Sequence, residues 1–157
     1  MAKFGHSTTG AEVVEHLRDM VKGKTGMIIN TETAYSLAAG APACILLAGR
    51  SLPKIQPVID RISGAYPDVE NRFLPLDLGS QNAVREAAAS INESVQSVDI
   101  LINNAAIMGG PFAKTADGIE DQFGTNHIGH FLLTNLIMEK LTAGQGARIV
   151  NLSSSGH

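Results

Sequence analysis

The chain has 157 residues, of which 44% are hydrophobic and 17% are charged, and its formal net charge is −3. These values are typical of a soluble globular protein with one domain and a sizeable core. Lysines and arginines do not cluster, which argues against a nucleic-acid or anionic-membrane partner. Cys44 is the only cysteine, which excludes an intramolecular disulfide and a cysteine metal cluster.

Cys44 lies in the apolar run ACILLAG, which indicates a buried structural thiol rather than a nucleophile. The first ten residues are too polar for a signal peptide. No apolar run approaches the roughly 20 residues of a membrane span. We therefore expect a cytoplasmic protein without a transmembrane segment.

The first predicted element is a helix over residues 9–22. Thr9 and Glu12 have the spacing of a capping box, and Gly23 can end the helix. Apolar residues with helical periodicity form a stripe on it: Val13, Val14, Leu17, Met20 and Val21. We interpret residues 1–23 as an N-terminal helical extension of a single domain over residues 1–157.

Short apolar strands then alternate with amphipathic helices. Strands are expected at 26–30, 43–50, 72–78, 98–106 and 147–155. Helices are expected between them at 31–39, 52–62, 80–91 and 117–141. This alternation predicts an α/β fold, a doubly wound parallel sheet of about five strands covered by helices on both faces. Gly129, inside the last helix, suggests close packing against a neighbour, because glycine weakens a helix by roughly 1 kcal/mol relative to alanine.

Ligands of such sheets bind beyond the carboxyl ends of the strands. Arg50 ends the second strand, where an arginine would suit the 2′-phosphate of NADP, although a solvated arginine is the simpler interpretation. Asp77 lies at the end of the third strand, where it could contact adenine or cap the helix that starts near Ser80.

Three further motifs allow two interpretations each. The two asparagines of NNAA could tie neighbouring strands together beside a cofactor, or form a simple turn. His127 and His130 are three residues apart, but no third ligand stands at a telling spacing, so we expect no metal. The three serines at 153–155 could bind a substrate oxygen, or form a loop.

Taken together, these segments resemble the short-chain dehydrogenase/reductase family, in its retinol-dehydrogenase-like and fungal forms, over nearly all of residues 12–157. The resemblance rests on segments that occur in the family's order and spacing: ILLAGRS, LPLDL, ILINNAAIM, TNHIGHFLLTNLI and ARIVNLSSS. It implies a Rossmann-like fold and NADP(H)-dependent interconversion of a small apolar alcohol and its carbonyl.

The resemblance also assigns roles to individual residues. Asn126 matches the catalytic asparagine that holds a water in the proton relay, and Ser154 matches the catalytic serine that orients the substrate oxygen. Positions that match the family's cofactor contacts are Arg50, Asp77, Leu78, Asn104, Ala105, Ala106 and Ser153.

The sequence departs from the family at three places. The glycine-rich loop expected after the first strand is absent from KTGMIINTETAYSLAAG, and Glu32 stands where the pyrophosphate would lie, so NADP(H) affinity should fall sharply. Neither tyrosine is followed by the family's lysine four residues later, because Ala39 and Glu70 occupy those positions. Ala106 replaces a usual glycine.

These departures imply a truncated member of the family with an incomplete sheet that lacks its C-terminal part, and without turnover as this chain. The alternative is a non-catalytic interaction module. It would pair with a full-length relative, as a homo- or hetero-oligomer, through the open sheet edge or the long helix.

Overall fold

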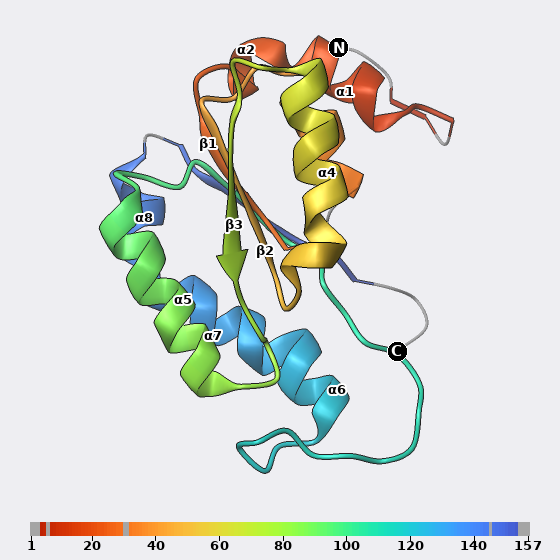
Figure 1. The fold of residues 1–157 in the computed structure, drawn as a ribbon, viewed down its shortest axis with the longest axis vertical. Helices are drawn as coiled ribbons and strands as arrows, with labels where there is room; N and C mark the ends of the chain where they lie inside the picture. The colour runs from red at the N-terminus through yellow and green to blue at the C-terminus, as the bar shows by residue number, and fades with distance from the viewer. Residues whose placement is uncertain (1–3, 6, 30–31, 145, 154–157) are drawn as a thin grey trace.

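The computed structural model describes residues 4–5, 7–29, 32–144 and 146–153. Its centre is one sheet of five parallel strands in the order β3-β2-β1-β4-β5 (Figure 1). The strands are β1 Thr25–Ile28, β2 Cys44–Gly49, β3 Glu70–Pro75, β4 Ile100–Asn103 and β5 Arg148–Asn151. The predicted α/β parallel sheet is confirmed, and each strand lies within two residues of the start expected from the sequence.

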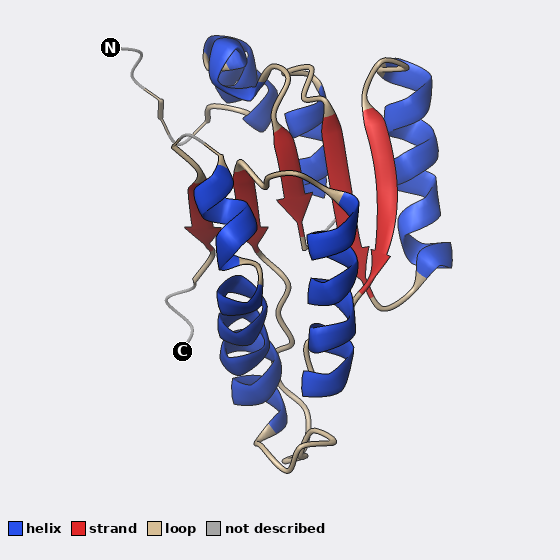
Figure 2. Ribbon diagram, turned by 90° about the vertical axis from the view of Figure 1, so that its left-hand side faces the viewer, coloured by secondary structure: helices blue, strands red, loops and turns tan. Residues whose placement is uncertain are grey.

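Helices cover both faces of the sheet, as Figure 2 shows. In chain order they are α1 Gly10–His16, α2 Arg18–Val21, α3 Glu32–Ala38, α4 Leu52–Ala65, α5 Gln81–Ser94, α6 Asp121–Phe123, the π-helix η1 Gly124–Ile128, α7 Gly129–Leu136 and α8 Met138–Ala143. In Figure 1, α4 lies on one side of the strands and α5 and α7 lie on the other.

The alternation of side chains along each strand divides the core into two layers. Met27 of β1 packs with Leu46 of β2 in the layer under α5 and α7, where Val84, Ile91 and Leu133 are fully buried. The next residue along β1 faces the opposite way and packs into the layer under α3 and α4. Because both faces are covered, the inner strands are apolar at nearly every position, with Thr25 and Asn103 as the polar exceptions.

Cys44 opens β2 and is buried in the first of these layers. Burial raises the pKa of its thiol, and the nearby carboxylate of Glu70 adds to that rise. The thiolate is therefore disfavoured, as expected for a structural rather than a nucleophilic cysteine.

The helix expected at 9–22 is in fact two short helices, α1 and α2, which meet at Leu17. Leu17 leaves the helical conformation, with φ −105° and ψ 19°, so the apolar stripe does not stay on one face. Val21 is buried, whereas Met20 is 56% exposed. The capping box is confirmed: Thr9 accepts a hydrogen bond from the Glu12 amide, and the Glu12 carboxylate accepts one from the Thr9 amide.

The single long helix expected at 117–141 is also divided. It begins at Asp121, widens into the π-helix η1, continues as α7 and breaks at Ile137 before α8. Apolar periodicity does not distinguish these forms, because each keeps one side of the segment on the core. No helix of the described residues is long and apolar enough to cross a bilayer.

Candidate functional site

Every strand of this sheet ends at the same edge, so the residues after the strands converge there. Arg50 follows β2, Asp77 follows β3 by two residues, and the 104–106 segment follows β4. Ser153 follows β5 and is exposed. The residues that link β1 to α3 at this edge are only three, 29–31, and two of them lie outside the described residues.

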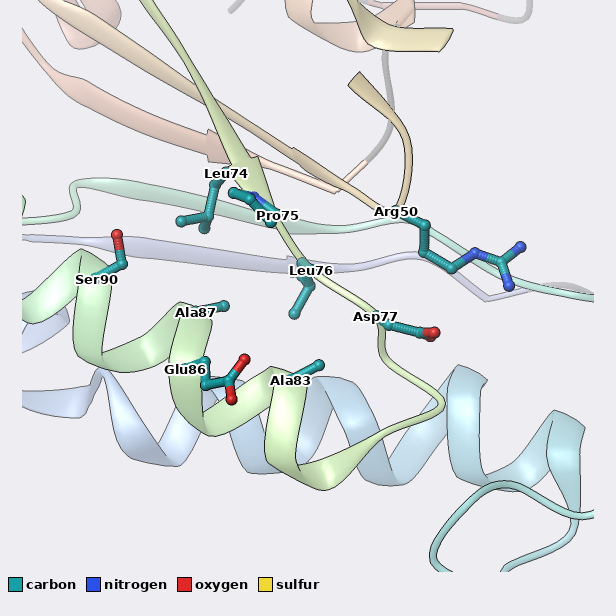
Figure 3. Close-up of a pocket in the computed structure, with 9 residues that line it drawn as sticks. All are labelled: Arg50, Leu74, Pro75, Leu76, Asp77, Ala83, Glu86, Ala87 and Ser90. Atoms are coloured by element: carbon teal, nitrogen blue, oxygen red, sulfur yellow. The ribbon is translucent and has the colours of Figure 1, made fainter. Parts of the chain in front are cut away.

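An open pocket of about 410 Å³ lies where β2 and β3 end, between these strands and α5. Its lining is shown in Figure 3: Arg50, Leu74, Pro75, Leu76, Asp77, Ala83, Glu86, Ala87 and Ser90. Leu74 and Leu76 are buried and give it an apolar floor against α5. The side chains of Arg50 and Asp77 extend together at one end of the pocket, away from α5 (Figure 3). A charged end and an apolar floor suit a ligand with both polar and flat apolar parts.

Asp77 does not cap α5. That role belongs to Ser80, whose hydroxyl accepts a hydrogen bond from the Ala83 amide at 3.3 Å. Asp77 instead accepts a hydrogen bond from the Gly79 amide at 2.9 Å, which closes the turn between β3 and α5. The start of α5 is further tied by Asp117, which accepts from the Gln81 amide at 2.8 Å. The sequence did not suggest this last contact.

Leu78 is buried, and it lies against the helix that follows β4. A side chain at Gly129 would meet the Leu78 carbonyl oxygen, and it would stand 2.8 Å from the Leu78 Cβ. Only glycine allows this approach, so the close packing predicted at Gly129 is confirmed. The contact fixes the turn after β3 relative to α7.

The chain leaves β4 as an extended segment that runs along the helix formed by α6, η1 and α7. In Figure 1 it is the blue-green loop that leaves the sheet and returns to α6. Asn103 donates hydrogen bonds to the Asn151 side chain at 2.8 Å and to the Thr134 hydroxyl at 3.3 Å. This asparagine therefore ties β4 to both β5 and α7, one of the two roles expected for the asparagine pair.

Asn126 lies in the π-helix η1, a helix form found frequently at functional sites. Its side-chain oxygen accepts from the Ile107 amide and its side-chain nitrogen donates to the Ile107 carbonyl, both at 2.8 Å. Both ends of the amide thus hold the segment after β4. The catalytic role that the resemblance implies for Asn126 stays a prediction.

His130 is buried and bonds to the Ala105 carbonyl through Nε2 at 2.8 Å. A carbonyl only accepts, so Nε2 carries the proton and, in the neutral ring, Nδ1 carries the lone pair. Burial lowers the pKa of this imidazole, and the neighbouring His127 lowers it further. His130 is therefore neutral near pH 7.

His127 has different surroundings from His130. Its ring is exposed and stacks between Phe123 and Phe131, with ring centroids 5.3 and 6.4 Å away. The described residues contain no group of three or more histidine, cysteine, aspartate or glutamate side chains arranged to hold a metal ion.

The three residues expected to line a cofactor after β4 divide between two faces. Ala105 packs against the core layer under α5 and α7. Ala106 is exposed and Asn104 is half-buried. Ser154 lies outside the described residues, as do Asn30 and Thr31 of the short β1–α3 connection.

Sequence reasoning missed the bonding role of His130, and it missed that of Gln122, whose side-chain oxygen accepts from the Gly109 amide at 3.3 Å. A signal did exist. Gln122, Asn126 and His130 are polar or ionisable residues spaced by four along one helix, which places them on one side of it.

The sequence profile described as "short chain dehydrogenase" matches residues 31–156. Human "Retinol dehydrogenase 13" is 43% identical over 143 residues, which cover 87% of this chain and 43% of that protein. The chain thus spans about half the length of the curated relatives it matches.

Two solved structures share the fold. A short chain dehydrogenase from Salmonella enterica serovar Typhi has a TM-score of 0.75 and 22% identity, over 88% of this chain and 60% of that one. A short chain dehydrogenase from Escherichia coli complexed with NADPH has a TM-score of 0.71 and 17% identity, over 84% and 59%. The sheet, the site at its carboxyl edge and the profile match define one class: this chain belongs to the short-chain dehydrogenase family, with a Rossmann-like fold.

Proposed function

We propose that this chain forms the dinucleotide-facing half of an NADP(H)-dependent oxidoreductase that interconverts an alcohol and its carbonyl. One observation carries the proposal. Arg50 and Asp77 follow adjacent strands and extend together from one end of an open pocket at the carboxyl edge of the sheet (Figure 3). In a dinucleotide fold this edge receives the adenosine end of the cofactor.

The charge of Arg50 supports NADP(H) over NAD(H). Arg50 is exposed, and no ion pair among the described residues involves it, so its guanidinium is free to meet the 2′-phosphate. Arginine binds phosphate through two parallel donors, which makes the contact strong and directional. Asp77 keeps one carboxylate oxygen outside its bond to Gly79, and that oxygen can accept from the adenine amino group.

The pyrophosphate end of the cofactor has weaker support. The β1–α3 connection has three residues, none of them glycine, and α3 is only seven residues long. Phosphates reach backbone amides most easily where glycines line the turn before a helix. We therefore propose that the adenosine end contributes most of the affinity and that binding is weak for a member of this family.

NADP(H), when bound, supplies or accepts the hydride. Asn126, whose amide bonds to the backbone at Ile107, would fix the segment beside the nicotinamide end, and Ser154 would donate to the substrate oxygen. Met108 and Phe112 lie further along the same segment and are 87% and 76% exposed. These exposed apolar side chains favour an apolar substrate, in keeping with relatives named retinol dehydrogenases.

Calorimetric titration of residues 1–157 with NADPH and NADH tests this function. We expect saturable binding that prefers NADPH, and no turnover, because these residues contain no tyrosine followed by lysine four positions later. Arg50→Ala should weaken NADPH binding about tenfold or more, the range for a hydrogen bond to a charged group, and leave NADH binding unchanged. Arg85→Ala, an exposed arginine on α5, is the matched control. Equal affinity of the wild type for both cofactors would contradict the proposal.

A second candidate function is an interaction module that pairs with a full-length relative. Among the described residues β5 has a single neighbour, β4, and its Ile149 and Val150 are 41% and 44% exposed. The stacked rings of Phe123, His127 and Phe131 form an exposed aromatic stripe on the long helix. Unpaired edges and apolar patches of this kind attract partners.

Sedimentation of the chain, alone and mixed with full-length human retinol dehydrogenase 13, distinguishes the two functions. A defined complex that Val150→Lys or Phe131→Asp abolishes would favour the module. Leu52→Lys is the control, because Leu52 is 42% exposed on α4, outside β5 and the long helix. If the chain sediments as a monomer both alone and in the mixture, the interaction module is contradicted and cofactor binding is favoured.

A further inference from the structure

The hydrogen bonds between the segment after β4 and the helix beside it follow a regular pattern. Asn103 bonds to Thr134, Ala105 to His130, Ile107 to Asn126 and Gly109 to Gln122. Each step advances two residues along the extended segment and goes back four along the helix. We call this set of four contacts the ladder and each of the four contacts a rung.

The spacing of the ladder follows from backbone geometry. Six residues of extended chain, from Asn103 to Gly109, span about 20 Å at the rise of a strand. Twelve residues of helix, from Gln122 to Thr134, span about 18 Å at the rise of an α-helix. The two lengths match, so every second residue of the segment can meet every fourth residue of the helix.

The π-helix η1 keeps the ladder straight. Four residues of α-helix rotate about 40° past a full turn, so three such steps would carry the last rung about 120° round the helix. A π-turn, with its i→i+5 hydrogen bonds, holds more residues per turn and rotates the later residues back. η1 spans Gly124–Ile128, in the middle of the ladder, where this correction serves all four rungs.

The ladder also determines which residues face outward. The residues between the rungs are Asn104, which is half-buried, and Ala106 and Met108, which are exposed. In an extended segment alternate residues point to opposite sides. The rungs therefore face the helix, and the intervening residues face the space beyond the sheet where a ligand would lie.

We propose that His130 is a positioning residue: its Nε2–H holds the Ala105 carbonyl, and this contact presents the Asn104–Ala106 segment to the dinucleotide. The contact to the dinucleotide rests on the proposed function, whereas the positioning of the segment does not. Of the side chains that form the four rungs, that of His130 is ionisable and buried. Its Nε2 lies 2.8 Å from the Ala105 carbonyl oxygen. Burial of His130 disfavours the imidazolium and lowers its pKa; the bond to the Ala105 carbonyl acts in the opposite direction, and the neighbouring His127 adds to the lowering. The neutral Nε2–H form is therefore the one that holds the segment.

Two variants separate positioning from simple packing. His130→Leu fills a similar volume with an apolar side chain and removes the Nε2–H donor. His130→Gln restores an N–H donor at nearly the position of Nε2, so it should rescue the contact. His127→Leu is the matched control, because His127 is exposed three residues earlier on the same helix.

The first measurement uses nitrogen-15-labelled chain and needs no cofactor. Imidazole spectra should show His130 as the Nε2–H tautomer, and amide hydrogen exchange at residues 105–107 should accelerate about tenfold in His130→Leu, the factor that corresponds to roughly 1.4 kcal/mol. His130→Gln should return the exchange to near the wild-type rate, and His127→Leu should leave it unchanged. A protonated Nδ1, or unchanged exchange in His130→Leu, would overturn the proposal.

The second measurement is NADPH affinity of the same proteins. A loss in His130→Leu with recovery in His130→Gln would support the contact to the dinucleotide, and equal affinity in all variants would overturn that part. If the wild type binds neither cofactor, the proposed function fails, while the exchange rates still decide whether His130 positions the segment.

Discussion

The two edges of the sheet differ in how their side chains are covered. β3 lies at one edge, yet its Leu74 is 5% exposed, because α5 packs against one of its faces and α4 against the other. β5 lies at the other edge, and its Ile149 and Val150 remain 41% and 44% exposed. Both strands carry apolar side chains that a covering helix could bury. The difference shows that the flanking helices, more than the sequence of the strand, decide what this fold buries.

The largest expected effect is a difference in stability loss between substitutions in β4 and in β5. Leu101 and Ile149 are register partners on adjacent strands, and Leu101 is fully buried. Leu101→Ala should lower the free energy of unfolding by about 2–5 kcal/mol through lost burial and a cavity. Ile149→Ala should cost about 1 kcal/mol or less, because much of that side chain already meets water. Urea titration of both variants checks this, and similar losses would show that β5 is better covered than its exposure indicates.

The next effect concerns Asp99, whose side chain joins the start of β4 to the start of β1. Asp99 precedes β4; its carboxylate accepts from the Thr25 amide at 2.9 Å and pairs with Lys24 at 3.2 Å. Its backbone carbonyl accepts from the Arg148 amide at the start of β5. Asp99→Ala should destabilise by about 1–3 kcal/mol, because it leaves the partly buried Thr25 amide without its acceptor.

The measurement for Asp99 is thermal unfolding at neutral pH. Lys24→Ala serves as its control and should cost much less, since Lys24 is 37% exposed and a partly solvated ion pair contributes little. Equal losses in the two variants would assign the effect to the ion pair rather than to the backbone contact.

A smaller effect compares two helical glycines. Gly129→Ala should destabilise by about 1–2 kcal/mol, since the clash with Leu78 exceeds the roughly 1 kcal/mol that alanine adds to a helix. Gly64 in α4 has nothing within 4 Å of an added Cβ, so Gly64→Ala should stabilise by up to about 1 kcal/mol. Opposite signs in chemical denaturation are the expected result; a stabilising Gly129→Ala would refute the close approach.

The smallest effect is a pH dependence at the His130 rung of the ladder. The pKa of His130 is lowered in the folded chain from its ordinary value of 6.5, so the unfolded chain binds the proton more readily. The stability that this group contributes is present above pH 6.5 and is lost as the pH falls from 6.5 toward the lower folded pKa. Denaturation of wild type and His130→Gln between pH 7.5 and 5.5 should show a steeper decline for the wild type. Parallel declines would mean that His130 is protonated equally in both states.

The sequence was sufficient to predict the sheet and its helices, because apolar strands covered on both faces have a continuous hydrophobic pattern. It also predicted the close packing at Gly129, since a glycine inside a helix needs a reason. It did not predict the break at Leu17, the π-turn or the break at Ile137. Backbone angles at single residues leave no trace in a 3.6-residue periodicity.

For the site, the sequence placed Arg50, Asp77 and the 104–106 segment at one edge, and the structure brings them there. It did not show that Ala105 turns inward while Ala106 turns outward. That distinction depends on how residues 103–109 align with the helix beside them. Every second residue of the segment meets every fourth residue of the helix. A motif search follows only one segment at a time.

The buried thiol of Cys44 has a practical consequence. The chain carries a single cysteine, and in the folded state it is enclosed at the start of β2 with a raised pKa. A thiol-reactive dye can therefore label the protein only during moments when the sheet opens. The rate of labelling would therefore measure how often the sheet opens, without any engineered probe. It would report on the β3–β2 side of the sheet, which is far from the exposed strand β5.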